Sequence, residues 1–132
     1  MKAITLPQPW ASLVAIGAKQ IETRTYATKY RGALAIHAAK TSTPVDDPYY
    51  RNLLQSAGLA YDELPYGAIL ATCRLNDCEK ITYANSPCYP EYAFSDFKPG
   101  WYAWHLSDIK PLAKPTPSRG HRGLWECSQV VS

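Results

Sequence analysis

The chain has 132 residues, of which 46% are hydrophobic and 19% charged, a composition typical of one globular domain and not of a disordered chain. Its formal net charge of +3 permits an anionic partner without demanding one, since domains dedicated to nucleic acid usually carry a larger excess. No apolar run approaches the length of a membrane span, and the N-terminal residues lack the apolar core of a signal peptide, so we expect a cytoplasmic protein.

Hydrophobic periodicity predicts a strand and a helix at the start of the chain. Residues 2–6 alternate between apolar and polar side chains, as in a short strand that Pro7 ends. Residues 9–17 follow helical spacing, with Gly17 as the C-terminal cap. The strand therefore leads almost directly into a short helix.

The period changes to two at Lys19, which predicts a second strand. It places Glu22 and Arg24 on one face of that strand and Lys19 on the other. Residues 32–40 form the next predicted strand, and residues 46–58 a helix that Gly58 ends.

The second half of the chain predicts three more strands. Residues 66–75 alternate, with one face formed by Ile69, Ala71, Cys73 and Leu75. Residues 84–100 contain three prolines and no clear period, so we expect an irregular excursion there. A strand at residues 101–108 is followed by a proline-rich connection at 109–123 and a terminal strand at 124–131.

These elements predict an α+β fold in one domain over residues 1–132. About six short strands, which do not follow the βαβ order of a parallel sheet, favour a small mixed β-barrel with two or three flanking helices.

The cysteines and histidines indicate no metal site. The chain has three histidines, and no pair of its cysteines shows C-x-x-C spacing, the four being Cys73, Cys78, Cys88 and Cys127. We therefore expect no metal and no cofactor, with the thiols reduced. Cys73 lies in an apolar alternating run and is expected in the core.

Residues 17–24, GAKQIETR, match the pattern G-x-K-x-x-E-x-R, and this stretch resembles the signature of the ASCH domain. The likeness extends to QPWASLVAIGAK, YRGALAIHAAK, YAWHLSDIKPL and RGHRGLWE, which are similar to segments of the larger bacterial and phage ASCH proteins. The resemblance implies a PUA-like β-barrel over most of the chain and is weakest at residues 84–100.

For function, the resemblance implies binding of single-stranded RNA or of a modified nucleoside or nucleotide. Some small bacterial members are amidohydrolases that deacylate acetylated cytidine, and ribonuclease activity has been proposed for others. The catalytic lysine of the amidohydrolases corresponds to Lys19, but their threonine at the motif glutamate position is Glu22 here, with Thr23 next to it. A non-catalytic adaptor in a regulatory complex is a third alternative.

The motif residues have a structural and a functional interpretation. Glu22 and Arg24 lie about 7 Å apart on one strand face and form either an ion pair of modest energy or part of a site. In a binding site Glu22 accepts hydrogen bonds from a base, Arg24 orients Glu22 or holds a phosphate, and Lys19 supplies charge. In a hydrolase Lys19 activates water or attacks, and Glu22 carries the proton.

Other candidate ligand contacts lie outside the motif's ionisable residues. Gly17 opens the motif, Trp10 is either a core ring or a surface for base stacking, and His37 is either a structural histidine or a border of the same cleft. Residues 110–122 contain no acidic side chain. Arg119 and Arg122 within them belong either to a solvated linker or to a basic rim that contacts phosphates.

Overall fold

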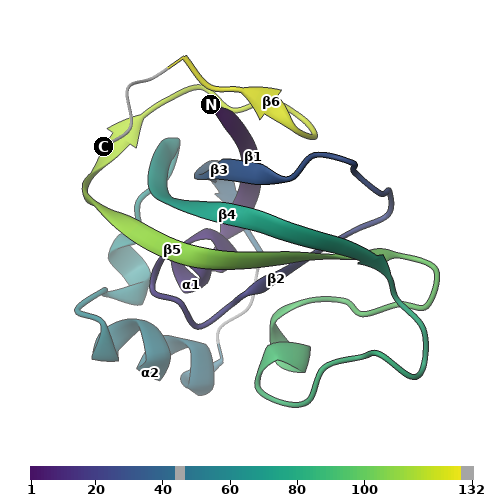
Figure 1. The fold of residues 1–132 in the computed structure, drawn as a ribbon. Coiled ribbons are helices and arrows are strands. Elements are labelled where there is room, and N and C mark those ends of the chain that lie inside the picture. Colours follow the sequence, from purple (N-terminus) through teal and green to yellow (C-terminus); the bar gives the residue numbers. More distant parts are fainter. Residues whose placement is uncertain (44–46, 129–132) are drawn as a thin grey trace.

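A computed structural model describes residues 1–43 and 47–128 of the chain. Its elements, in chain order, are β1 (Lys2–Gln8), α1 (Trp10–Ala15), β2 (Ile21–Arg24), β3 (Gly32–Ser42), α2 (Pro48–Ser56), η1 (Tyr61–Glu63), β4 (Ala68–Lys80), η2 (Glu91–Phe94), β5 (Tyr102–Pro117) and β6 (Trp125–Glu126). The six strands form one sheet in the order β2-β5-β4-β3-β1-β6 (Figure 1). Because β1 and β3 are parallel and the other neighbours antiparallel, the predicted mixed sheet with two helices is confirmed.

The main core lies between α1 and one face of the sheet. Ala11 and Val14 of α1 pack against Ile4 and Leu6 of β1, and Trp104 of β5 is fully buried in the same cluster. Among the cysteines, Cys73 and Cys127 are buried, Cys78 is half-buried and Cys88 is exposed. The prediction that Cys73 is a core residue is confirmed, and burial raises the pKa of its thiol to about 12.

The proline-rich connection predicted at residues 109–123 is wrong over most of its length, because β5 continues to Pro117. β5 pairs with β4 along one side but with β2 only from Tyr102 to His105. Over the proline-rich part, no other described strand pairs with its second side, and at such an edge a missing backbone donor costs little. Pro7 is likewise accommodated inside β1, since β6 pairs only with Lys2 and Ala3.

A register irregularity explains a second difference, in β4. The alternation predicted that Ile69 shares a face with Cys73 and Leu75, which lie in the main core. Ile69 packs instead with Ala3, Ala35 and Trp125 in a separate cluster. The β4–β5 pairing shifts between Ile69 and Ala71. Such a bulge changes the face that the preceding side chains occupy.

The helices begin and end close to the predicted positions. Gly17 has φ 85° and ends α1 with bonds from the amides of Gly17 and Ala18 to the carbonyls of Val14 and Leu13. The predicted start of the second helix, at residue 46, lies outside the described residues. Of the terminal strand predicted at residues 124–131, Trp125–Glu126 form β6, and residues 129–131 lie outside the described residues. No helix among the described residues is long and apolar enough to cross a membrane.

Candidate functional site

Lys19 lies between the end of α1 and the start of β2, and its side chain is only 1% exposed. Its ammonium donates to the carbonyls of Ile21 (2.6 Å) and Phe94 (3.1 Å) and contacts the hydroxyl of Ser95. The carboxylate of Glu22 is 3.5 Å away. The side chain of Lys19 therefore points into the protein.

Burial lowers the pKa of the Lys19 ammonium, while Glu22 and Glu91 act in the opposite direction.

The prediction that Lys19 and Glu22 lie on opposite faces of one strand is wrong. β2 begins only at Ile21, so strand alternation does not apply to Lys19, and its side chain reaches Glu22.

Glu22 connects the two cations of the motif. Its Oε2 accepts a bond of 3.1 Å from Nε of Arg24 and lies 3.1 Å from Nη2 of the same guanidinium. Arg24 also donates 3.1 Å to the backbone carbonyl of Thr5 on β1 and lies over the ring of Trp104, with its guanidinium carbon 5.9 Å from the ring centre. Since β1 and β2 are not neighbours in the sheet, this side chain links two strands that no backbone ladder joins.

A hollow of about 430 Å³ opens beside Glu22, and we call it the motif cleft. It is lined by Pro7, Trp10, Glu22, Thr23, Ala93, Phe94, Ser95 and Asp96. Trp10 is half-buried, donates 2.9 Å to the Thr43 hydroxyl and packs edge-on against Tyr50. It thus has features of both interpretations offered for it, a ring fixed by packing and a surface in the cleft.

The wall formed by residues 93–96 could not be found from the sequence. This segment lies in the excursion, and η2 is held against the motif by Glu91, whose carboxylate accepts bonds from the amides of Gln20 (2.8 Å) and Ile21 (3.3 Å). Burial raises the pKa of the Glu91 carboxyl, although these bonds and Lys19 favour its charged form. No periodicity in residues 84–100 indicates these contacts.

His37 does not border the motif cleft. It lines another hollow together with Arg119 and Arg122, and its side chain is 2% exposed. The ring contacts the Thr5 hydroxyl at 3.2 Å through Nδ1 and the Ser118 carbonyl at 2.8 Å through Nε2. The three predicted residues His37, Arg119 and Arg122 are therefore brought together, but apart from Glu22.

We expect the stability of the protein to fall as the pH drops below about 6.5, the ordinary value for histidine. Burial lowers the pKa of His37, and the bond to Ser118 only partly opposes this. Below this pH the His37 side chain binds a proton in the unfolded chain but not in the native protein, so unfolding is favoured at acidic pH. Urea unfolding at pH 7.5 and pH 5 should show a smaller loss of stability in His37→Gln than in the parent. Equal losses in the two proteins would contradict this assignment.

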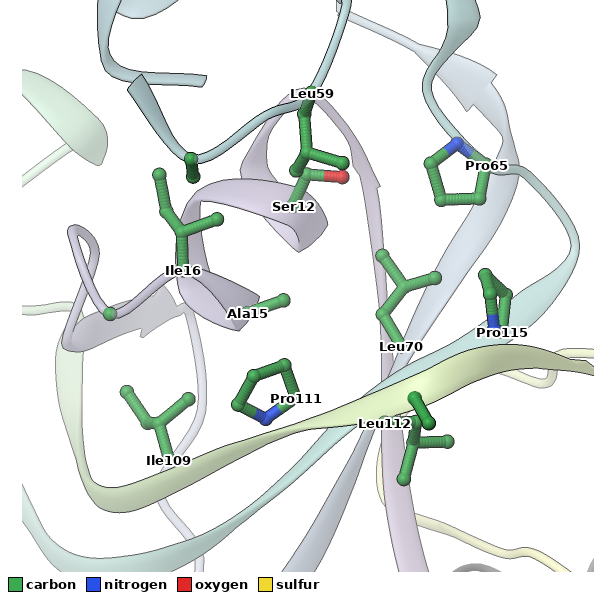
Figure 2. A pocket seen from close by; sticks show the side chains of 13 residues that line it. Ser12, Ala15, Ile16, Leu59, Pro65, Leu70, Ile109, Pro111, Leu112 and Pro115 are labelled. Carbon is green, nitrogen blue, oxygen red and sulfur yellow. The ribbon is translucent and has the colours of Figure 1, made fainter. Parts of the chain in front are cut away.

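Gly17 lines a third hollow, of about 440 Å³, between α1, the segment after α2 and β5. Figure 2 shows Ile16, Leu59, Leu70 and Pro111 around it. No ionisable residue of the motif lines it. Gly17 therefore forms the turn between α1 and Lys19, and Gly17 does not line the motif cleft.

The fold is that of an α+β domain with a mixed six-stranded sheet. Residues 4–116 match the family model of the ASCH domain, so the chain belongs to the ASCH domain family. Among solved structures it is similar to a mutant form of ZmASCH from Zymomonas mobilis, with 15% identity, a TM-score of 0.52, and coverage of 88% of this chain and 74% of that one. At this identity the likeness concerns the fold. No curated protein matches the chain.

Proposed function

We propose that the motif cleft binds a nucleobase of single-stranded RNA or of a nucleotide, with Glu22 as the hydrogen-bond acceptor. The observation that carries this proposal is the position of the Glu22 carboxylate: its side chain is 14% exposed, fixed by Lys19 and Arg24, and lines the cleft. Each carboxylate oxygen can accept more than one bond, so Glu22 retains acceptor capacity towards a ligand.

The charges of the motif cleft favour a base over a phosphate. Among the described residues, its two ionisable lining residues, Glu22 and Asp96, are both acidic. The cations that pair with them, Lys19, Arg24 and Lys98, do not line the cleft. An exocyclic amine donates to carboxylates. The rings of Trp10 and Phe94 line the same hollow and offer apolar surface for a base.

The experiment compares short oligocytidylate and oligouridylate. Cytosine carries an exocyclic amine and uracil does not, so the parent should bind oligocytidylate about tenfold more tightly, the value of one hydrogen bond to a charged group. Glu22→Gln should reduce this preference, because the amide presents one acceptor oxygen and a donor. Affinities measured by fluorescence anisotropy at constant salt would test this.

Glu63→Gln is the matched control, because Glu63 lies on η1, exposed and outside the lining of the motif cleft. It removes the same charge and should leave the preference intact. Equal binding of both oligomers by the parent, or equal effects of the two variants, would remove Glu22 from base recognition.

A hydrolase is the second candidate function, favoured by the contact between Lys19 and Ser95. The ammonium touches the Ser95 hydroxyl at the wall of the motif cleft, and burial lowers the pKa of Lys19. A lysine in its neutral form can take a proton from a hydroxyl or a water. The substrate class would be an N-acylated nucleoside or RNA.

A further inference from the structure

A basic pocket of about 420 Å³, which Thr5 lines, shares no lining residue with the motif cleft. Its cationic side chains are Lys40 from β3 and Arg119 and Arg122 from the segment after β5, and His121 lines it as well. Among the residues that the structure describes, no carboxylate lines this pocket. Within residues 1–43 and 47–128, Lys40, Arg119 and Arg122 form no ion pair with an acidic side chain. These three positive side chains around one hollow are suited to an anion.

Buried hydrogen bonds hold the wall of the basic pocket in place. The Ser118 carbonyl can only accept, so His37 carries its proton on Nε2 and accepts at Nδ1. The Thr5 hydroxyl can donate to that Nδ1, because its oxygen accepts a bond of 3.0 Å from the indole of Trp125. This chain of bonds ties residue 118 to β1 and β3.

Gly120 fixes the same wall by close contact. A Cβ at this position would lie 2.6 Å from Cε1 of His37 and 3.0 Å from the Thr5 hydroxyl. Only glycine therefore allows the backbone to approach the His37 ring this closely, with Arg119 and His121 on either side. These contacts preorganise the wall of the basic pocket without a ligand.

The basic pocket and the motif cleft are neighbours along β1. Thr5 lines the pocket and Pro7 lines the cleft. Residues two apart on a strand lie about 7 Å apart. The backbone carbonyl of Thr5 also accepts the bond from Arg24. One ligand can thus place different groups in the acidic cleft and in the basic pocket.

We infer that the basic pocket binds a terminal phosphate, the dianion of a phosphomonoester, on the nucleotide or oligonucleotide whose base occupies the motif cleft. The identity of that larger ligand rests on the proposed function. A dianion matches several converging cations better than an internal phosphodiester, which carries one charge and must leave the pocket on both sides. Arg119 and Arg122 can each form paired bonds to phosphate oxygens.

The test uses one cytidine oligomer with a 5′-phosphate, a 3′-phosphate or no terminal phosphate, titrated by calorimetry. The parent should bind one phosphorylated form about tenfold more tightly than the unphosphorylated form, as expected for charge-assisted bonds. Inorganic phosphate should compete for this gain. Arg119→Ala with Arg122→Ala should abolish the preference, and Gly120→Ala, which changes no charge, should weaken it by displacing the wall.

The matched control is Lys110→Ala with Lys114→Ala, which removes two positive charges from exposed positions of β5 and should keep the preference. A parent without preference, or a preference that survives the double arginine variant, overturns the pocket. In that case a retained preference for cytosine over uracil would leave the proposed function standing. Phosphate binding without any base preference would instead support the pocket and contradict the proposed function.

Discussion

Replacement of Glu22 by alanine should lower the free energy of unfolding by about 3 kcal/mol, the cost of breaking a buried ion pair from one side. Lys19 is 1% exposed and would lose its carboxylate partner. The neighbouring Arg24 would then act on it only by repulsion. Glu22→Gln should cost less, because the amide oxygen still accepts a bond. Urea unfolding of both variants measures the difference.

Glu126→Ala is an instructive control for this prediction. Glu126 also bridges two cations, the N-terminal ammonium at 3.0 Å and Lys2 at 3.3 Å, but its side chain is 65% exposed. Its loss should destabilise the protein far less, because water screens an exposed ion pair. If Glu22→Ala and Glu126→Ala cost the same, the motif carboxylate has no special structural role. If the prediction holds, part of any loss of ligand binding in Glu22→Ala comes from reduced stability. Glu22→Gln is then the better variant for testing base recognition, because it should remain more stable.

Lys19→Met should abolish any hydrolysis of acetylated cytidine or RNA by this protein. Methionine fills much of the buried volume but can neither take a proton nor contact Ser95 through an amine. Since burial lowers the pKa of Lys19, the parent's rate should rise with pH and level off below about 10.4, the ordinary value for lysine. Chromatography of the products at high enzyme concentration, over a pH series, provides the measurement.

Two further variants give this result a structural meaning. Ser95→Ala removes the hydroxyl that Lys19 contacts and should also lower the rate, whereas Lys114→Met removes a lysine on β5 outside the motif cleft and should not. Unfolding curves for each variant separate lost chemistry from lost structure. Absence of product from the parent would remove the hydrolase candidate and leave base binding untouched.

The sequence predicted the elements better than their pairing. Periodicity identified the strands at residues 2–6 and 32–40 and the first helix, which correspond to β1, β3 and α1. It did not indicate that residues 34–38 and 11–15 are buried on every side. The prolines at residues 111, 115 and 117 led to the prediction of a connection where β5 continues. The energetic cost of a proline in a strand depends on whether its backbone nitrogen faces an unpaired edge. Strand order decides this and is not visible in the local sequence. The bulge beside Ile69 was hidden for the same reason.

For the candidate site, the motif identified Lys19, Glu22 and Arg24 as neighbours but not how they meet. Glu22 touches both cations because Lys19 precedes β2 and folds back towards it. The other wall comes from residues 93–96, more than 70 positions away in the chain. It is held there by Glu91 through backbone amides. Contacts to backbone groups leave no pattern in a single sequence.

The distribution of cysteines supplies a built-in attachment point for a reporter dye. Cys73 and Cys127 are buried and Cys78 is half-buried, so a maleimide reagent should modify the exposed Cys88 first. Cys88 belongs to the excursion that also carries Phe94 and Ser95, and its carbonyl accepts a bond from the amide of Tyr92. A fluorophore placed there would sense occupancy of the motif cleft in the natural sequence, without any engineered residue.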